Sequence, residues 1–314
     1  MQAFQLQTCA SKWFEYIMKK GLKRPLELAI EIASSKPYTI SFSEGHEPRI
    51  VEAAVEAVNL GIAKIILVGK VEKVKHQLAK YPCSYPDRIK IHDPIRSSLI
   101  KEFSKSYYEL RKHKGITYED AKKQATSNLV YAALLVKNGH ADGTLSGAVE
   151  TTSNVVKTAI WVLGKATQVK TVSSCFLIFP KSHEPMIYAD CGLVIEPNDE
   201  ELVDITIAAS QSCKSLLNTD PRIALLSFST KGSAKHRNTD KILLALKKLK
   251  SLEPELLVDG ELQFDAAIDS AVGKIKAPES KVAGTANVMI FPNLDAGNIA
   301  YKITQRLGNA DAYG

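Results

Sequence analysis

Residues 38–68 read YTISFSEGHEPRIVEAAVEAVNLGIAKIILV, and this stretch by itself predicts the class of fold. A short β-branched run, Tyr38–Phe42, is followed by a polar loop and then by residues 49–60, whose apolar side chains recur at helical spacing. Gly61 ends this helix, and residues 62–68 form a second apolar run. The apolar face of the helix consists of Ile50, Val51, Ala54, Val55 and Val58. A strand, a helix and a strand in this order indicate an α/β fold with a parallel sheet.

The same alternation of apolar runs and amphipathic segments continues along the chain. A long helix is expected over residues 118–138, where Asn138 and Gly139 provide the stop signal. After about residue 168 the pattern changes to a hairpin, for which residues 181–185 supply the turn. The hairpin strands are expected over residues 169–180 and 186–195, further strands over 222–228 and 288–291, and helices over 200–217, 239–252 and 296–307. We therefore predict two domains, residues 1–168 and 169–314, the first with an extension over residues 1–20.

Length, charge and cysteine content exclude several classes of protein. With 314 residues, 45% of them apolar, the chain is long enough for two ordinary domains. The net charge of +7 suits acidic small molecules as well as nucleic acid, but the lysines lack the interleaved aromatic residues of a single-strand binder, so we expect no nucleic acid partner. Five widely spaced cysteines without a Cys-x-x-Cys pair indicate reduced thiols of a cytoplasmic protein.

No membrane association is expected. The sequence has no uncharged apolar run of about 18 residues that would cross a bilayer. Its N-terminus lacks the charged start and the unbroken apolar centre of a secretory signal, which leaves an amphipathic targeting helix as the weaker alternative.

The segment Ala141–Ser153 is a candidate anion-binding loop. Its glycines, Gly143 and Gly147, can adopt positive φ and let backbone N–H groups approach an anion, while Ser146, Thr151 and Thr152 supply hydroxyl donors. The alternative is an ordinary strand-to-helix turn with an N-cap, and the segment taken alone favours that alternative.

Two cationic side chains are further candidates. Lys231 follows the apolar run 222–228, so its ammonium is expected at the carboxyl end of a parallel sheet, where open α/β sheets bind ligands. The alternative is a loop in which Ser233 caps a helix, and the order Lys-Gly-Ser excludes a Walker motif. Residues 111–114 form a basic run, in which Arg111 is the best candidate because a guanidinium makes bidentate contacts with phosphate. The alternative is a solvated helix end, which is what most such runs are.

Residues 291–302 predict a strand end, a polar turn and a helix start. Asn293 and Asn298 could line the same binding site as Arg111 and Lys231. The purely structural alternative is that Asp295 is a good N-cap. The acidic group Asp259, Glu261 and Asp265 equally suits a strand exit and the first turn of a helix, and nothing nearby completes a set of ligands. We therefore expect no metal site.

Five segments together resemble the phosphate acetyltransferase family in order and spacing; they span residues 108–115, 141–148, 226–234, 259–266 and 291–307. The resemblance runs from about residue 43 to the end. It implies two α/β/α domains with a cleft between them, similar to the isocitrate and isopropylmalate dehydrogenase group, and usually a homodimer. It further implies reversible acetyl transfer between acetyl phosphate and coenzyme A, the latter as a substrate, with no metal and no other cofactor.

The resemblance and the residue chemistry together assign eight residues to substrate binding: Arg111, Ser146, Thr151, Thr152, Lys157, Lys231, Asn298 and Tyr301. Two departures from the family stand out. Lys157 occupies a position where the family usually has an arginine that holds phosphate, and lysine lacks the planar fork. Family members also continue past residues 306–308 into a stretch with a Ser-Arg pair and an aspartate of catalytic role, which the resemblance implies is absent here, so no catalytic residue is assigned.

Three alternatives to an active acetyltransferase remain open. The first is a butyryltransferase, because the sequence does not reveal the volume of the acyl pocket. The second is a catalytically impaired relative that binds acyl-CoA or regulates, which the departure at Lys157 favours. The third is a truncated product of a longer enzyme.

Overall fold

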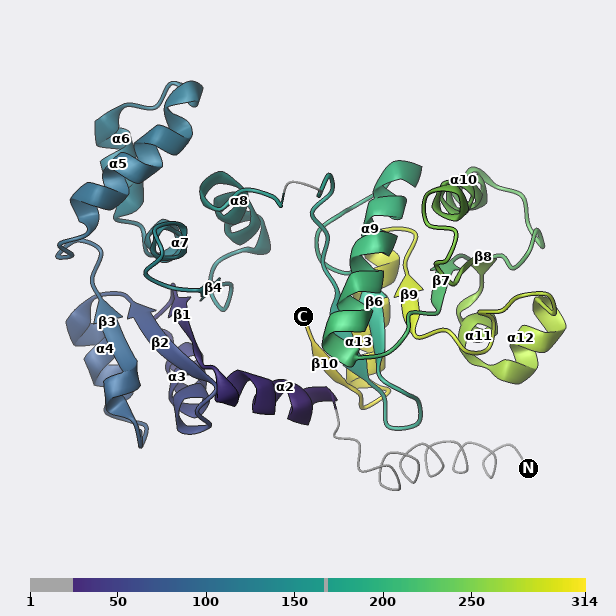
Figure 1. Ribbon diagram of the computed structural model, residues 1–314, viewed down its shortest axis with the longest axis horizontal. Coiled ribbons are helices and arrows are strands. Elements are labelled where there is room, and N and C mark those ends of the chain that lie inside the picture. The colour runs from purple at the N-terminus through teal and green to yellow at the C-terminus, as the bar shows by residue number, and fades with distance from the viewer. Residues whose placement is uncertain (1–24, 167–168) are drawn as a thin grey trace. The chain divides into compact units, whose positions relative to one another are not determined.

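The computed structural model describes residues 25–166 and 169–314, which form two units, each with its own sheet and core (Figure 1). One unit consists of residues 26–166, and the other contains residues 169–314. The predicted N-terminal extension over residues 1–20 and the predicted boundary at residue 168 lie outside the described residues.

The unit of residues 26–166 is built on a four-stranded sheet in the order β3-β2-β1-β4. Its strands are β1 (Tyr38–Phe42), β2 (Ala63–Val68), β3 (Ile89–His92) and β4 (Gly143–Leu145). All pairings are parallel, as predicted, and Ile40 of β1 lies opposite both Ile65 of β2 and Gly143 of β4. The strand β4 was not predicted, since its three residues fall within the segment that the sequence marks as a loop.

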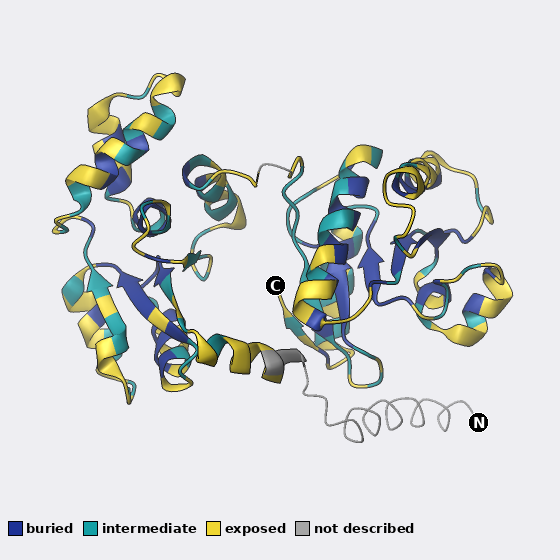
Figure 2. Ribbon diagram, viewed as in Figure 1, coloured by how far each residue is buried: buried dark blue, intermediate teal, exposed yellow. Residues whose placement is uncertain are grey.

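Helices cover both faces of this sheet, as Figure 2 shows by burial. The covering helices are α3 (Pro48–Asn59), α4 (Val71–Leu78), α5 (Ile100–Arg111), α6 (Tyr118–Ala125), α7 (Asn128–Lys137) and α8 (Thr152–Val162), with 3₁₀ turns at Pro86–Arg88 and Lys112–Lys114. The helix α2 (Pro25–Ser35) precedes β1, and its described side chains are largely exposed and belong to neither core. Along β2, Ile65 and Leu67 pack with α3 and α4, whereas Ile66 and Val68 pack with α5 to α8. Because neighbouring strand residues point to opposite faces, the unit has three α/β/α layers.

The helix α3 confirms the apolar face that the sequence predicts, since its five predicted residues are its five buried ones. The single helix predicted over residues 118–138 is wrong. It is divided into α6 and α7 by Thr126 and Ser127, and Ser127 has extended backbone angles (φ −69°, ψ 133°). The Thr126 hydroxyl donates to the Lys123 carbonyl at 2.7 Å, so a polar side chain competes for the helical backbone at the break.

The unit of residues 169–314 contains a six-stranded sheet in the order β10-β5-β6-β9-β7-β8. Its strands are β5 (Phe176–Phe179), β6 (Met186–Ala189), β7 (Ile223–Leu226), β8 (Val258–Leu262), β9 (Val288–Ile290) and β10 (Asp311–Tyr313). The strands β6 to β9 are parallel, and β5 pairs antiparallel with β6. The predicted hairpin is therefore confirmed, with shorter strands than expected.

Alternation along the strands again builds two cores. Ile187 of β6, Leu225 of β7 and Ile290 of β9 pack with α9 and α10, while the residues next to them pack on the other side with α11 and α13. The helices are α9 (Asp199–Ser212) with a π-helical extension (Cys213–Leu217), α10 (Arg237–Leu252), α11 (Phe264–Ile268), α12 (Ser270–Lys276) and α13 (Leu294–Arg306). No helix among the described residues is both long enough and apolar enough to cross a membrane.

The start of α13 differs from the prediction. Asn293 rather than Asp295 is the N-cap, and its side chain accepts a hydrogen bond from the backbone N–H of Ala296 at 3.0 Å. A Cβ atom on Gly297 would lie 2.2 Å from the carbonyl oxygen of Asp190. Only glycine therefore allows α13 to approach the end of β6 so closely.

Candidate functional site

The carboxyl ends of β1 and β4 carry two serines that lie side by side. Ser43 follows β1 and Ser146 follows β4, and the Ser43 hydroxyl donates to the Ser146 hydroxyl at 2.8 Å. The backbone N–H of Ser43 also donates to the carbonyl of Leu145 at 3.2 Å. The predicted substrate ligand Ser146 thus stands at the edge of a parallel sheet where ligands commonly bind.

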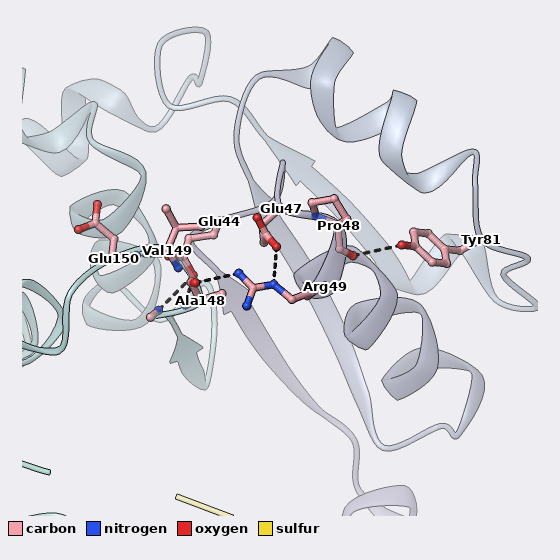
Figure 3. A network of polar contacts seen from close by, with 9 residues as sticks. Glu44, Glu47, Pro48, Arg49, Tyr81, Ala148, Val149 and Glu150 are labelled. Carbon is pink, nitrogen blue, oxygen red and sulfur yellow. Dashed lines mark hydrogen bonds and ion pairs between the residues drawn. The ribbon is translucent and has the colours of Figure 1, made fainter.

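The loop after Ser146 binds an anion, and the anion is the chain's own Glu44 (Figure 3). One carboxylate oxygen accepts from the N–H groups of Gly147 and Ala148 at 3.1 and 2.9 Å, and the other accepts from Val149 and Glu150 at 2.8 and 2.7 Å. Gly147 has a φ of 110°, which only glycine adopts easily. Burial raises the pKa of Glu44, but the four hydrogen bonds outweigh it and hold the pKa below its ordinary value.

The sequence predicts the donors of this loop but not their partner, Glu44. Glu44 follows the strand β1 that neighbours β4, so the pairing of these strands places it beside the loop. Arg49 ties the same loop to the start of α3, because it donates to the Ala148 carbonyl at 3.0 Å and to Glu47 at 2.6 Å (Figure 3). These backbone N–H groups are therefore already engaged within the unit.

Two predicted substrate ligands, Arg111 and Lys157, meet at the indole ring of Trp161. The Arg111 Cζ lies 4.1 Å from the ring centroid, and the Lys157 Nζ lies 4.5 Å from it. Arg111 is the last residue of α5, and Lys157 precedes Trp161 by one turn on α8. Within residues 25–166 and 169–314, neither cation forms an ion pair with a carboxylate. Two uncompensated positive charges at one ring are suited to binding an anion.

A cavity of about 200 Å³ is lined by Lys157 and Trp161, and Arg111 contacts the Trp161 ring without lining the cavity itself. Along α8 it is lined by Asn154, Lys157 and Trp161, and on α5 by Tyr107. Burial raises the pKa of Tyr107, against a smaller opposing effect of Arg111, so its hydroxyl stays neutral and adds no negative charge. Glu150 also lines the cavity, where its side chain accepts a hydrogen bond from the Asn154 amide at 3.1 Å.

The two threonines at the start of α8 lie elsewhere on that helix. Thr151 is the N-cap, and its hydroxyl accepts from the N–H of Asn154 at 3.2 Å. Thr152 is exposed in the first turn, and neither threonine lines the cavity. The turn with an N-cap, which the segment alone favoured, is therefore present.

In the unit of residues 169–314, Lys231 lies in the loop after β7 and is paired within the fold. Its ammonium forms an ion pair with Asp259 and donates to the Gly260 carbonyl at 3.1 Å. Burial raises the pKa of Asp259, but Lys231 and further hydrogen bonds outweigh burial and lower it. The expected cap at Ser233 is wrong, because His236 caps α10.

The neighbouring acids are also held by protein partners. The Glu261 carboxylate is buried and accepts from the Ser229 hydroxyl at 2.9 Å and from the Gly232 N–H at 2.7 Å. Asp265 pairs with Lys276 at 2.8 Å. Across the part of the chain that the structure describes, no three histidine, cysteine or acidic side chains are grouped so that they could hold a metal ion.

Asn298 and Tyr301 lie on α13, near the β5–β6 hairpin. The Asn298 amide donates to the Cys191 carbonyl at 3.1 Å, and its oxygen accepts from Lys302 at 2.7 Å. The Tyr301 ring stacks on Phe176, with centroids 4.1 Å apart and planes 17° apart. Among the eight predicted ligands, the structure thus brings Arg111 and Lys157 to one place, and Thr152 is exposed. The others have separate partners: Ser146, Thr151, Lys231, Asn298 and Tyr301.

Comparison with known proteins gives a consistent result. The family model described as phosphate acetyl/butaryl transferase matches residues 26–314. The phosphate acetyltransferase of Acetivibrio thermocellus is 42% identical over 294 residues, which cover 92% of this chain and 88% of the relative. That of Clostridium acetobutylicum is 39% identical over 294 residues, with the same two coverages of 92% and 88%.

Solved structures agree with the sequence relatives. A phosphotransacetylase from Streptococcus pyogenes superimposes with a TM-score of 0.85 at 37% identity and covers 92% of this chain and 88% of that chain. The EutD phosphotransacetylase from Staphylococcus aureus gives a TM-score of 0.81 at 36% identity, with coverages of 92% and 88%.

Proposed function

The chain belongs to the phosphate acetyl/butyryl transferase family, and we propose that it transfers an acetyl group reversibly between acetyl phosphate and the thiol of coenzyme A. The observation that carries this proposal is the meeting of Arg111 and Lys157 at Trp161, beside a cavity and without a carboxylate partner. Both substrates are anionic, so two adjacent positive charges would gather and orient them.

In the proposed reaction, Arg111 and Lys157 hold the phosphoryl group of acetyl phosphate. The coenzyme A sulfur attacks the acetyl carbon, a C–S bond forms, and the C–O bond to phosphate breaks. Negative charge develops on the carbonyl oxygen and passes to the departing phosphate, where fixed cations stabilise it without reorganising. A base would assist loss of the thiol proton, because a free thiol of pKa about 8.5 is mostly protonated at neutral pH.

The remaining predicted ligands are retained as proposed substrate contacts. Ser146 follows the carboxyl end of β4, Thr152 is an exposed hydroxyl at the start of α8, and Asn298 donates to the carbonyl of Cys191, the second residue after β6. Lys231 would have to exchange Asp259 for a substrate phosphate. Thr151 and Tyr301 would act mainly through the cap and the stacked ring described above.

The test is formation of the acetyl-CoA thioester from acetyl phosphate and coenzyme A by the purified chain. Arg111→Ala is expected to lower kcat/KM by about tenfold to a hundredfold, the range of a hydrogen-bonded charge. Lys105→Ala is the matched control, because Lys105 is an exposed cation on the same helix, and it should leave the rate unchanged. Absence of any thioester formation by the unaltered protein overturns the proposal.

Two alternatives are outcomes of the same assay. A higher kcat/KM with butyryl phosphate than with acetyl phosphate would identify a phosphate butyryltransferase. Binding of acetyl-CoA in calorimetry without turnover would identify a catalytically impaired relative. Dialysis against a chelator is expected to leave the rate unchanged, since the proposed reaction uses coenzyme A as a substrate and needs no metal.

We further propose a homodimer in the cytoplasm. The four cysteines among the described residues are free thiols, in accord with a reducing compartment. Burial raises the pKa of the Cys191 and Cys213 thiols, which keeps both unreactive. The dimer follows from the family resemblance alone, and light scattering of the purified chain at micromolar concentration tests it: a monomeric mass would exclude it.

A further inference from the structure

The two cations at Trp161, Arg111 and Lys157, differ in the shape and flexibility of their charged groups. The Arg111 guanidinium is a planar fork, whereas the Lys157 ammonium is a point charge at the end of a flexible stem. Lys157 is exposed and has no ion-pair partner within the described residues. The contact that the structure gives its Nζ atom is the indole face at 4.5 Å.

The Trp161 ring is available for contacts with cations because it does not belong to the apolar core of its unit. Its neighbour Val162 is buried and belongs to the apolar cluster on this face of the sheet, while Trp161 is half-buried and stands outside the side chains described for that cluster. The ring instead lines the cavity, on the same face of α8 as Asn154 and Lys157.

We propose that Trp161 is a positioning residue, whose indole holds the Lys157 ammonium and the Arg111 guanidinium together beside the cavity so that both act on one phosphate group. Two like charges repel, and the negative face of an indole offsets part of that repulsion. This inference rests on the proposed function for the identity of the anion, but the positions of the three side chains are independent of it.

The direct measurement is binding of inorganic phosphate by calorimetry. Trp161→Leu is expected to weaken binding about two- to fivefold, the range of an exposed cation–π contact. Trp161→Phe keeps an aromatic ring that attracts cations less strongly than indole. Its affinity for phosphate should therefore lie between those of the unaltered protein and of Trp161→Leu. Ile160→Ala is the control, because Ile160 is an exposed neighbour on α8 that does not line the cavity, and it should leave phosphate binding unchanged.

A double-mutant cycle separates positioning from a general loss of structure. If Trp161 acts through Lys157, then Trp161→Leu should cost clearly less phosphate affinity in a Lys157→Ala background than in the unaltered protein. The same smaller cost is expected in an Arg111→Ala background. Equal fold-changes in all three backgrounds overturn the inference. The inference is also overturned if adding Lys157→Arg to Trp161→Leu fails to restore affinity for phosphate. An arginine at this position would depend less on the ring than lysine does, because its guanidinium is a planar fork.

If Trp161→Leu does not fold, Trp161→Phe takes its place in the cycle, and the fluorescence of Trp161 in a Trp13→Phe protein provides a second readout. Phosphate that engages the two cations should change this emission, and an unchanged emission at saturating phosphate overturns the inference. If Trp161 is coupled to the two cations in phosphate binding but no acetyl-CoA forms, the inference holds and the acetyltransferase proposal is overturned. If acetyl-CoA forms but no coupling is measured, the proposal holds and the inference is overturned.

Discussion

At the scale of single residues, the most informative side chain is Glu44. A segment rich in glycine and hydroxyl residues reads as a phosphate loop, and its N–H groups do converge on an anion. That anion is a carboxylate from the neighbouring strand end, held by four hydrogen bonds of 2.7 to 3.1 Å. The charge of the proposed substrate must therefore be met by side chains, of which Arg111 and Lys157 are the pair brought together.

Removing the charge of Glu44 should destabilise the unit that contains it. Glu44→Gln replaces an acceptor oxygen with an amide that faces backbone N–H donors, so we expect the free energy of unfolding to fall by about 2–4 kcal/mol in urea titrations. Glu47→Gln is the matched control in the same network, and its loss should stay below about 1 kcal/mol because the partner Arg49 is exposed. Equal losses for the two variants would contradict this account.

The same carboxylate should make stability depend on pH in acid. The pKa of Glu44 in the folded protein lies below the ordinary value of 4.5, so the folded state favours the ionised form. Its contribution is therefore complete above about pH 4.5 and is lost as the pH falls through the folded pKa. Unfolding free energies of the unaltered protein and of Glu44→Gln, measured between about pH 3 and pH 6, should converge toward the acid end; a constant difference would refute this.

At the scale of elements, local signals placed the helices and strands well and their ends less well. Periodicity predicted α3 with all of its buried residues, but the break between α6 and α7 was missed because each side of it continues the same apolar pattern. The cap of α13 was placed two residues late, since Asn293 and Asp295 are both good N-cap residues. Which of the two residues caps α13 depends on where the preceding strand, β9, ends and the helix can begin.

The corrected cap of α13 can be tested by two alanine variants. Asn293→Ala should lower the free energy of unfolding by about 1 kcal/mol, because it removes the acceptor for the Ala296 N–H. Asp295→Ala should cost less, about 0.3–1 kcal/mol, since Asp295 only complements the helix dipole in the first turn. A larger loss for Asp295→Ala in parallel urea titrations would restore the original assignment.

At the scale of the whole molecule, the chain forms two units, and each has an apolar core on either side of its sheet. Leu134 on α7 and Leu249 on α10 are fully buried, one in each unit. Each core therefore holds the strands and helices of its own unit in place.

Matched core substitutions should act on their own units. Leu134→Ala and Leu249→Ala are each expected to remove about 2–5 kcal/mol of stability, because each leaves a cavity in a packed core. Hydrogen–deuterium exchange should rise in residues 26–166 for the first variant and in residues 169–314 for the second. Leu307→Ala is the control, because Leu307 is 84% exposed and should change neither. Uniform faster exchange in both units would refute separate cores.

The sequence by itself determined the class of fold and the order of most elements, because spacing and composition along short stretches are local properties of the chain. The family was indicated by the resemblance of five segments, and the site residues that this resemblance implies stay predictions. Only the tertiary structure decided that Glu44 occupies the N–H groups after Ser146, that Lys231 is neutralised by Asp259, and that Arg111 and Lys157 share Trp161. Each of these contacts joins residues that strand pairing or helix packing brings together, and periodicity along the sequence carries no information about which distant side chains will meet.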